Sequence, residues 1–265
     1  MTPLLLCFLA QIPAAWTPDL SMQVQRVSAV TPSPDGRWVA YTQTRPVMEA
    51  ERSEAITHIF LARADGSARA QLTRGEKSAT QPAFSADSRF VLFLSERSGK
   101  PNLWRIPVDG GEAEALTAWK GEISAFRVSP DGRTVAFTAL EERADDEKHK
   151  KEKLDYRVID ENPRSHGLWL VPFEAGQQGQ RVPRKLAAPA SHIGAFDWSP
   201  DSRHIAFSHT PSPLADNWTQ ADISEVDVEG GAIRPLAVTA AAEDTPRYSP
   251  DGRYLAYSRS SEPVR

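Results

Sequence analysis

Two acids and an arginine in one polar segment have the side chains that bind charged groups. Asp160, Glu161 and Arg164 lie within residues 155–166, which read DYRVIDENPRSH. The two carboxylates could hold a cationic group, and the guanidinium of Arg164 could hold an anionic group through paired hydrogen bonds. The alternative is an ordinary polar loop, because charged loops are commonly just solvated. We interpret these three residues as binding residues and assign them no catalytic role.

The sequence lacks the motifs that would predict catalysis, a metal or a cofactor. A serine hydrolase carries its nucleophile in a G-x-S-x-G turn, and no such turn occurs. There is no H-E-x-x-H zinc motif and no glycine-rich phosphate loop. The single cysteine, Cys7, excludes an intramolecular disulfide and a cysteine-based zinc site. We therefore predict no catalytic residue, no metal and no cofactor in these 265 residues, and we interpret His58 and His204 as structural residues of strands.

A five-residue phrase occurs five times and has an aspartate at its third position each time. The copies begin 52, 44, 70 and 50 residues apart. They are Ser33-Pro34-Asp35-Gly36-Arg37, Ser85-Ala86-Asp87-Ser88-Arg89, Ser129-Pro130-Asp131-Gly132-Arg133, Ser199-Pro200-Asp201-Ser202-Arg203 and Ser249-Pro250-Asp251-Gly252-Arg253. Recurring carboxylates could suggest a metal array, but this phrase has the composition of a tight turn. Proline presets φ, aspartate bonds to nearby backbone N–H groups, and glycine or serine takes the less common dihedral angles. We interpret the aspartates as turn formers.

An apolar strand follows each phrase and predicts a sheet that is buried on both faces. The five strands read WVAYT, FVLFLS, TVAFTA, HIAFSH and YLAYSR, and their β-branched and aromatic residues favour strands. A short strand precedes the phrase, and a third and a fourth strand follow it; the third strand of the first repeat is expected to begin at His58. Four strands in about 45 residues is the period of a β-propeller blade.

The repeats predict an all-β protein, with an incomplete β-propeller of four-stranded blades over residues 16–265. Four complete blades are expected near residues 26–73, 76–118, 121–188 and 192–238, and a partial fifth blade begins near residue 243. Four and a half blades do not close a ring, and an open end exposes unpaired backbone. We therefore expect this sequence to be truncated from a larger propeller; the alternative is a smaller closed propeller.

A charged insertion at about residues 139–166 accounts for the 70-residue spacing in the third blade. Its first part, EERADDEKHKKEK at residues 141–153, contains acid-before-base pairs four residues apart. Such pairs favour an exposed helix.

Residues 1–15 predict a secretory signal peptide. The apolar run from Leu4 to Ala10 precedes Ala14 and Ala15, whose small side chains suit cleavage, although no lysine or arginine precedes the run. The run is shorter than the roughly 20 residues that span a bilayer. We expect a periplasmic or secreted protein without a membrane span; a cytoplasmic location is the alternative.

The net charge of −4 and the lack of a basic stripe make nucleic acid an unsuitable partner.

The repeats resemble those of one enzyme family. SPDGRWVAY, SPDGRTVAF, WSPDSRHIAF and YSPDGRYLAY are similar to the propeller repeats of the prolyl oligopeptidase family of serine peptidases, closest to its bacterial acylaminoacyl-peptidase and dipeptidyl-peptidase branches. The lead-in WTPDLSMQVQRVSAVTPSPDGRWVAY resembles the start of those propellers. The segment DYRVIDENPRSHGLWLVPF, which follows the charged insertion, resembles the corresponding part of the family.

This resemblance implies a non-catalytic propeller that shields an active site and selects small peptide substrates. The Ser-Asp-His triad of the family lies in a C-terminal α/β-hydrolase domain that these residues do not contain, so peptidase activity is expected only of a longer parent protein. By position, Asp160, Glu161 or Arg164 could contact the peptide, although their spacing does not reproduce the paired-glutamate motif of the dipeptidyl-peptidase branch. The alternative is a stand-alone periplasmic propeller that binds proteins, like TolB, which shares the SPDG repeat.

Overall fold

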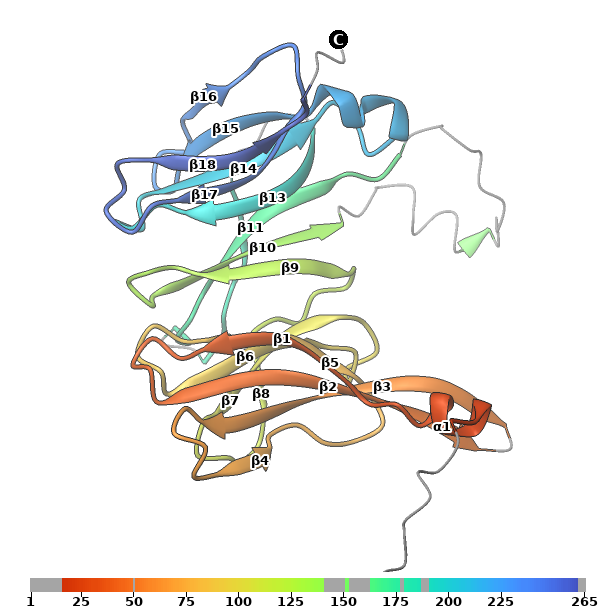
Figure 1. The fold of residues 1–265 in the computed structure, drawn as a ribbon. Helices are drawn as coiled ribbons and strands as arrows, with labels where there is room; N and C mark the ends of the chain where they lie inside the picture. The colour runs from red at the N-terminus through yellow and green to blue at the C-terminus, as the bar shows by residue number, and fades with distance from the viewer. Residues whose placement is uncertain are drawn as a thin grey trace, which may run out of the picture.

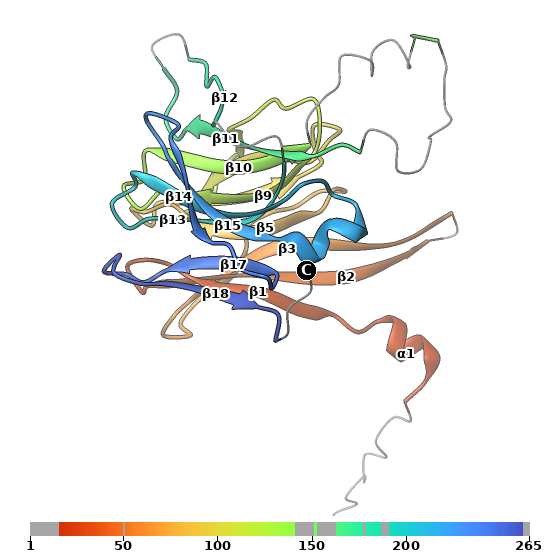
Figure 2. The same ribbon diagram turned by 90° about the horizontal axis from the view of Figure 1, so that it is seen from above.

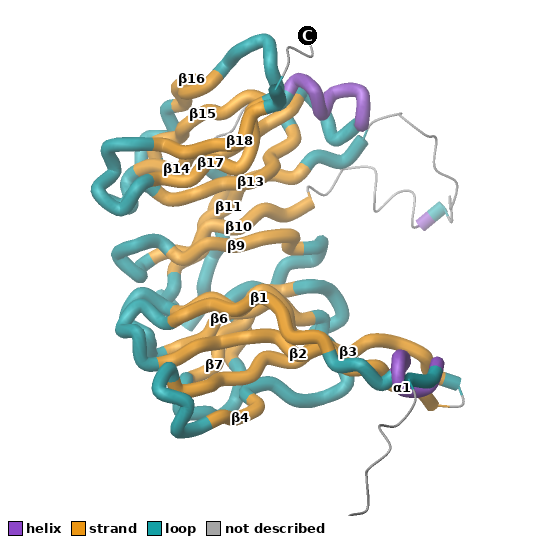
Figure 3. Tube along the Cα trace, in the orientation of Figure 1, coloured by secondary structure: helices purple, strands orange, loops and turns teal. Residues whose placement is uncertain are grey.

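The computed structural model describes residues 16–49, 51–140, 151–152, 163–176, 179–186 and 191–261. The described chain consists almost entirely of strands and turns (Figure 3). The expected signal peptide at residues 1–15 lies outside the described residues, as does the helix expected at residues 141–153 apart from residues 151 and 152. No helix in the described ranges has the length and apolar character needed to cross a bilayer.

Four sheets of four antiparallel strands and one sheet of two strands follow one another along the chain. The first blade contains β1 (Arg26–Pro32), β2 (Trp38–Glu49), β3 (Arg52–Arg63) and β4 (Arg69–Gln71). The second contains β5 (Ala79–Phe84), β6 (Phe90–Ser95), β7 (Asn102–Pro107) and β8 (Glu114–Ala115). The third contains β9 (Ile123–Val128), β10 (Thr134–Leu140), β11 (His166–Pro172) and β12 (Arg184–Lys185). The fourth contains β13 (His192–Trp198), β14 (His204–Thr210), β15 (Asp222–Asp227) and β16 (Ile233–Ala237), and the fifth contains β17 (Glu243–Tyr248) and β18 (Leu255–Arg259).

The predicted blade pattern is confirmed, and one predicted boundary is wrong. Each expected blade coincides with one sheet, and strands run in sequence order across every sheet. The third strand of the first blade begins at Arg52, not at His58. The reason is that β2 and β3 remain paired well beyond the blade, from Trp38↔Arg63 to Glu49↔Arg52.

The five sheets stack in an arc (Figures 1 and 2). The first and fifth sheets lie at opposite ends of the stack in Figure 1, and the view from above places both on the side of the arc away from the third. Hydrogen bonds join the first strands of neighbouring blades: Thr31 to the Pro82 carbonyl at 3.2 Å and Gln81 to the Ser124 carbonyl at 2.9 Å. The Trp198 indole donates to the Arg127 carbonyl at 3.1 Å.

Apolar side chains fill the spaces between consecutive sheets. In the third blade, Phe137 joins a cluster shared with the second blade, whereas its neighbour Ala136 joins a cluster shared with the fourth. In the second blade, Leu92 packs toward the third blade and Val91 toward the first. Successive residues of a strand point to opposite faces, so each of these central strands is buried on both sides, as its unbroken apolar run predicts.

The Ser-Asp phrase forms the turn between the first and second strands of every blade. In the first blade, the Ser33 hydroxyl donates to Asp35 Oδ1 at 2.6 Å and accepts from the Trp38 N–H at 2.9 Å. Asp35 Oδ1 also accepts from the Arg37 N–H at 3.0 Å. The other four phrases have the same serine-to-aspartate distance of 2.6 Å. The interpretation of the aspartates as turn formers is confirmed.

The fourth position of the phrase adopts a left-handed backbone conformation in all five turns. The φ angles are 69° at Gly36, 60° at Ser88, 71° at Gly132, 61° at Ser202 and 70° at Gly252. Glycine takes this conformation without steric cost. At the two serines, a hydrogen bond offsets the steric cost of this conformation, because each hydroxyl accepts a bond from a backbone N–H of the preceding blade. Ser88 Oγ lies 3.1 Å from the Asp35 nitrogen, and Ser202 Oγ lies 3.0 Å from the Asp131 nitrogen.

Substitutions at Ser88 should separate this interblade hydrogen bond from the backbone conformation. Ser88→Ala keeps the left-handed conformation and loses the bond, so the free energy of unfolding should fall by about 0.5–1.5 kcal/mol. Ser88→Gly also loses the bond but removes the steric cost, so its effect should be smaller. Urea unfolding measures both, with Ser98→Ala at an exposed position as the control. Equal effects of Ser88→Ala and Ser98→Ala would contradict a stabilising bond.

Acid should weaken these turns. The Ser33 hydroxyl and then the Arg37 N–H lower the pKa of Asp35, and Ser199 and the Arg203 N–H lower the pKa of Asp201 in the same way. The unfolded chain therefore binds more protons, and this contribution to stability is complete above about pH 4 and declines as the pH falls toward the folded pKa values. Urea unfolding between about pH 5 and pH 3 should show a smaller decline for the double variant Asp35→Asn/Asp201→Asn than for the wild type. An identical decline would be the contrary result.

Candidate functional site

The two ends of the blades carry different connections. One end, on the left in Figure 1, carries the Ser-Asp turns and the hairpins between third and fourth strands. The opposite end, on the right in Figures 1 and 2, carries α1 (Pro18–Met22) and the connections between second and third strands. Three of these connections are long: the β2–β3 hairpin, the connection from β10 to β11, and the connection from β14 to β15 with its 3-10 helix η1 (Ala215–Gln220). We call this side the elaborated end, since insertions on a rigid scaffold are common locations of binding sites.

The β2–β3 hairpin forms an arm that extends beyond its blade. Each of its strands has 12 residues, whereas the second and third strands of the next three blades have six or seven. Five or six extra residues extend the arm by about 17–20 Å. The Thr44 and Thr57 hydroxyls lie 2.8 Å apart across its two strands, which is a favourable pair on one face of an antiparallel sheet.

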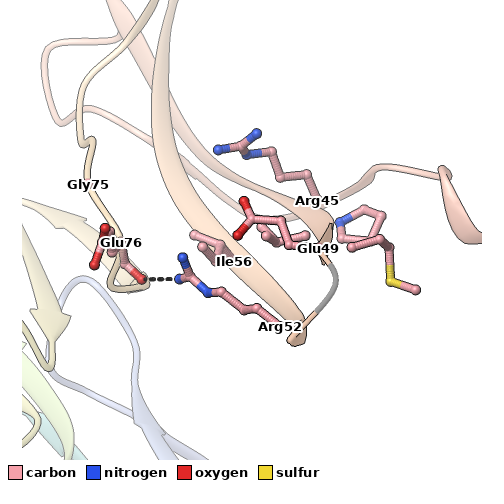
Figure 4. Close-up of a pocket in the computed structure, with 9 residues that line it drawn as sticks. Arg45, Glu49, Arg52, Ile56, Gly75 and Glu76 are labelled. Carbon is pink, nitrogen blue, oxygen red and sulfur yellow. Dashed lines mark hydrogen bonds between the residues drawn. The ribbon is translucent and has the colours of Figure 1, made fainter.

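A pocket of about 290 Å³ lies between this arm and the connection from β4 to β5 (Figure 4). Val47 and Ile56 form its apolar part and are 9% and 4% exposed. The remaining lining residues are Arg45, Pro46, Met48, Glu49, Arg52, Gly75 and Glu76. The pocket therefore combines two arginines and two glutamates with the buried side chains of Val47 and Ile56.

Arg52 ties the arm to the opposite wall of the pocket. Its guanidinium donates to the Glu76 carbonyl at 3.2 Å, drawn as the dashed line in Figure 4, and also forms an ion pair with Glu54. The hydrogen bond with Glu54 raises the pKa of Arg52. The carboxylates of Glu49 and Glu76 and the guanidinium of Arg45 carry the other charges around the pocket. Such a lining can hold a small molecule that carries both an acidic and a basic group next to an apolar side chain.

His58 lies two residues beyond Ile56 on β3, at the inner end of the pocket face. It is 3% exposed, and its Nδ1 has no hydrogen-bond partner in the described structure. Burial lowers its pKa, and the charge of Arg45 lowers it further. His58 lies within β3, as expected for a residue of a strand, and its neutral ring contributes no charge to the pocket near neutral pH.

One serine and one histidine at the elaborated end are hydrogen-bonded to each other. Ser124 Oγ lies 2.7 Å from His166 Nε2. A nucleophilic serine also needs donors for the developing oxyanion and a group that orients the histidine. Within the described residues, the charge of Glu122 acts on His166, but no carboxylate hydrogen bond to its ring is present. This pair therefore lacks the arrangement of a catalytic triad.

The structure tests the predicted binding residues only in part. Asp160 and Glu161 lie outside the described residues. Arg164 is half-buried and precedes β11 by two residues, so it lies at the elaborated end. The arm and its pocket were missed from the sequence. The run from Trp38 to Val47 is rich in aromatic and β-branched residues, and this signal could have indicated a long strand.

Comparison with known proteins decides the family. The family model described as "TolB beta propeller domain" matches residues 21–164. The chain belongs to this family. Its propeller is 30% identical over 264 residues to dipeptidyl-peptidase 5 of Porphyromonas gingivalis, covering 91% of this chain and 38% of that protein. The dipeptidyl-peptidase 5 of Porphyromonas endodontalis is 26% identical with the same two coverages. This TolB-type propeller thus spans 38% of the length of these two peptidases, and the resemblance to peptidase propellers of the prolyl oligopeptidase family is confirmed.

Solved structures share the fold of this TolB-type propeller. Acylaminoacyl peptidase from Pyrococcus horikoshii superposes with a TM-score of 0.60 at 15% identity, over 86% of this chain and 35% of that one. The putative TolB from Agrobacterium tumefaciens superposes with a TM-score of 0.58 at 19% identity, over 89% of this chain and 70% of that one. At these identities the likeness concerns the fold alone.

Packing of the arm against the pocket can be tested at Ile56. Ile56→Ala should lower the free energy of unfolding by about 2–4 kcal/mol, because it removes buried methyl groups and leaves a cavity. Ile56→Val should cost about 0.5–1.5 kcal/mol. Val27→Ala, at a position that is 57% exposed, is the control. If Ile56→Ala costs no more than this control in urea unfolding, the arm does not pack as described.

Proposed function

We propose that this chain is the non-catalytic propeller region of a serine peptidase, and that it shields the active site and selects small peptides. In this proposal the catalytic residues lie in an α/β-hydrolase domain of a longer polypeptide in the periplasm or outside the cell. The observation that carries the proposal is the match to dipeptidyl-peptidase 5, which extends over 91% of this chain but only 38% of the peptidase. The remaining length of such a relative is available for a catalytic domain.

The elaborated end has the features that substrate selection requires. Its arm projects from a rigid stack of sheets and limits which molecules can pass on that side. The pocket on the arm offers Arg45 to a peptide carboxylate and Glu49 to a peptide amine, next to the apolar Val47 and Ile56. We also keep Asp160, Glu161 and Arg164 as proposed substrate contacts, because the segment that contains them enters β11 at this same end.

A second candidate function is a stand-alone propeller that binds proteins. The observations that favour it are the TolB family match and the likeness to TolB from Acinetobacter baumannii, with a TM-score of 0.57 at 21% identity over 87% of this chain and 48% of that one. Under this alternative the complete reading frame encodes a propeller without a hydrolase domain.

The complete reading frame, expressed and purified, separates these functions. We expect it to hydrolyse chromogenic dipeptide amides and short peptides, to leave folded proteins intact, and to lose hydrolysis when it is cut back to residues 1–265. Replacing residues 48–53 by Asn-Gly should shorten the arm, since Val47 and Glu54 are opposite each other and a two-residue turn can join them. This variant should cleave longer peptides faster than the wild type while hydrolysing the smallest amide at a similar rate.

Arg37→Ala, at the exposed turn on the opposite end, is the matched control and should leave the peptide-length profile unchanged. A reading frame without a G-x-S-x-G turn, or one whose product cleaves folded proteins as readily as peptides, would contradict the peptidase proposal. Binding of periplasmic proteins by a product without hydrolase activity would support the TolB-like alternative.

A further inference from the structure

Two histidines meet at the seam between the third and fourth blades. His166 is the first residue of β11, and His192 is the first residue of β13. Their ring centroids are 5.0 Å apart at an interplanar angle of 72°. The His166 backbone N–H donates to His192 Nδ1 at 3.2 Å. This bond joins the two blades at the elaborated end, at the residue where the chain enters β11.

The bond requires a neutral ring at His192. A neutral imidazole has one nitrogen that accepts a hydrogen bond, whereas both nitrogens of the charged imidazolium are donors. With Nδ1 as the acceptor, the proton of neutral His192 lies on Nε2. Protonation of Nδ1 would place an N–H group against the His166 N–H, so the bond cannot persist in acid.

The surroundings of the two rings also oppose a positive charge. Burial lowers the pKa of His192, and the neighbouring His166 lowers it further. Burial likewise lowers the pKa of His166, although the Glu122 carboxylate acts in the opposite direction. Glu122 is itself paired with Lys100 at 3.7 Å, and Ser124 on β9 provides the uncharged partner of the His166 ring.

We propose that His192 is an acid-sensitive latch, which binds the start of β11 to the fourth blade at neutral pH and releases it in acid. Because the folded state favours neutral His192, the latch is fully formed above the ordinary histidine range near pH 6.5 and is lost as the pH falls below it. The Thr31, Gln81 and Trp198 bonds that join the first strands contain no group that titrates in this range. Release therefore acts selectively on the entry to β11, including Arg164 two residues before it. The inference does not depend on the proposed peptidase function.

Amide hydrogen exchange at His166, measured by NMR on the 265-residue chain, tests the latch. After correction for the intrinsic pH dependence of exchange, protection of this amide should fall about tenfold or more between about pH 7.5 and pH 5. In His192→Asn the amide oxygen can accept the same N–H without titrating, so the corresponding fall should be less than about threefold. His209→Asn is the matched control and should behave like the wild type, because His209 bonds Ser224 within the fourth blade.

An equal loss of protection in His192→Asn and the wild type would overturn the latch, and so would a wild-type amide whose protection does not change. A second measurement needs no variant. The His192 ring and the His166 amide resonances of the wild type should titrate with the same midpoint, which should lie below the ordinary histidine value of about 6.5. Different midpoints for the two signals would also overturn the proposal.

Discussion

Burial of each central sheet on both faces is the constraint on which the rest of this structure depends. A strand such as β10 places Phe137 against one neighbouring blade and Ala136 against the other. An interior blade therefore needs both neighbours to bury its apolar side chains. The Ser-Asp turns bring the first two strands of each blade together, and the serine hydroxyls of alternate turns reach the blade before. Hydrogen bonds of charged side chains also join neighbouring blades. Arg105 of the second blade bonds Glu174 beyond β11, whereas Glu225 of the fourth blade bonds Tyr248 of the fifth.

The two ends of the stack take part in this packing to different extents. Four of the five Ser-Asp turns at one end take part in interblade bonds. At the elaborated end, the β2–β3 arm extends beyond its blade, and the connections from β10 to β11 and from β14 to β15 are long. The charged pocket, the histidine seam and the candidate Arg164 all occur there. This is the end at which we propose that small peptides are selected, and the described residues do not form a catalytic triad.

Most of the fold could be predicted from the sequence because its signals are local and repeated. Proline, aspartate and glycine in the phrase specify a turn, and the apolar runs specify strands buried on both sides. Ser88 and Ser202 show where this reasoning stops, since their bonds to the preceding blade depend on distances that only the stacked sheets determine. The arm was missed because its polar outer half, including Arg52 and Glu54, lacks the apolar run that marked the other strands. The contact between His166 and His192 joins residues 26 apart and has no sequence signal.

The central claim is that this propeller positions and selects while the chemistry occurs in another domain. Labelling of the complete reading-frame product with a fluorophosphonate, followed by mass spectrometry of the labelled peptide, tests it most directly, because this reagent modifies activated serines. The account predicts a single labelled serine in a G-x-S-x-G turn outside residues 1–265. Labelling of a serine within the propeller, above all Ser124 beside His166, would contradict it.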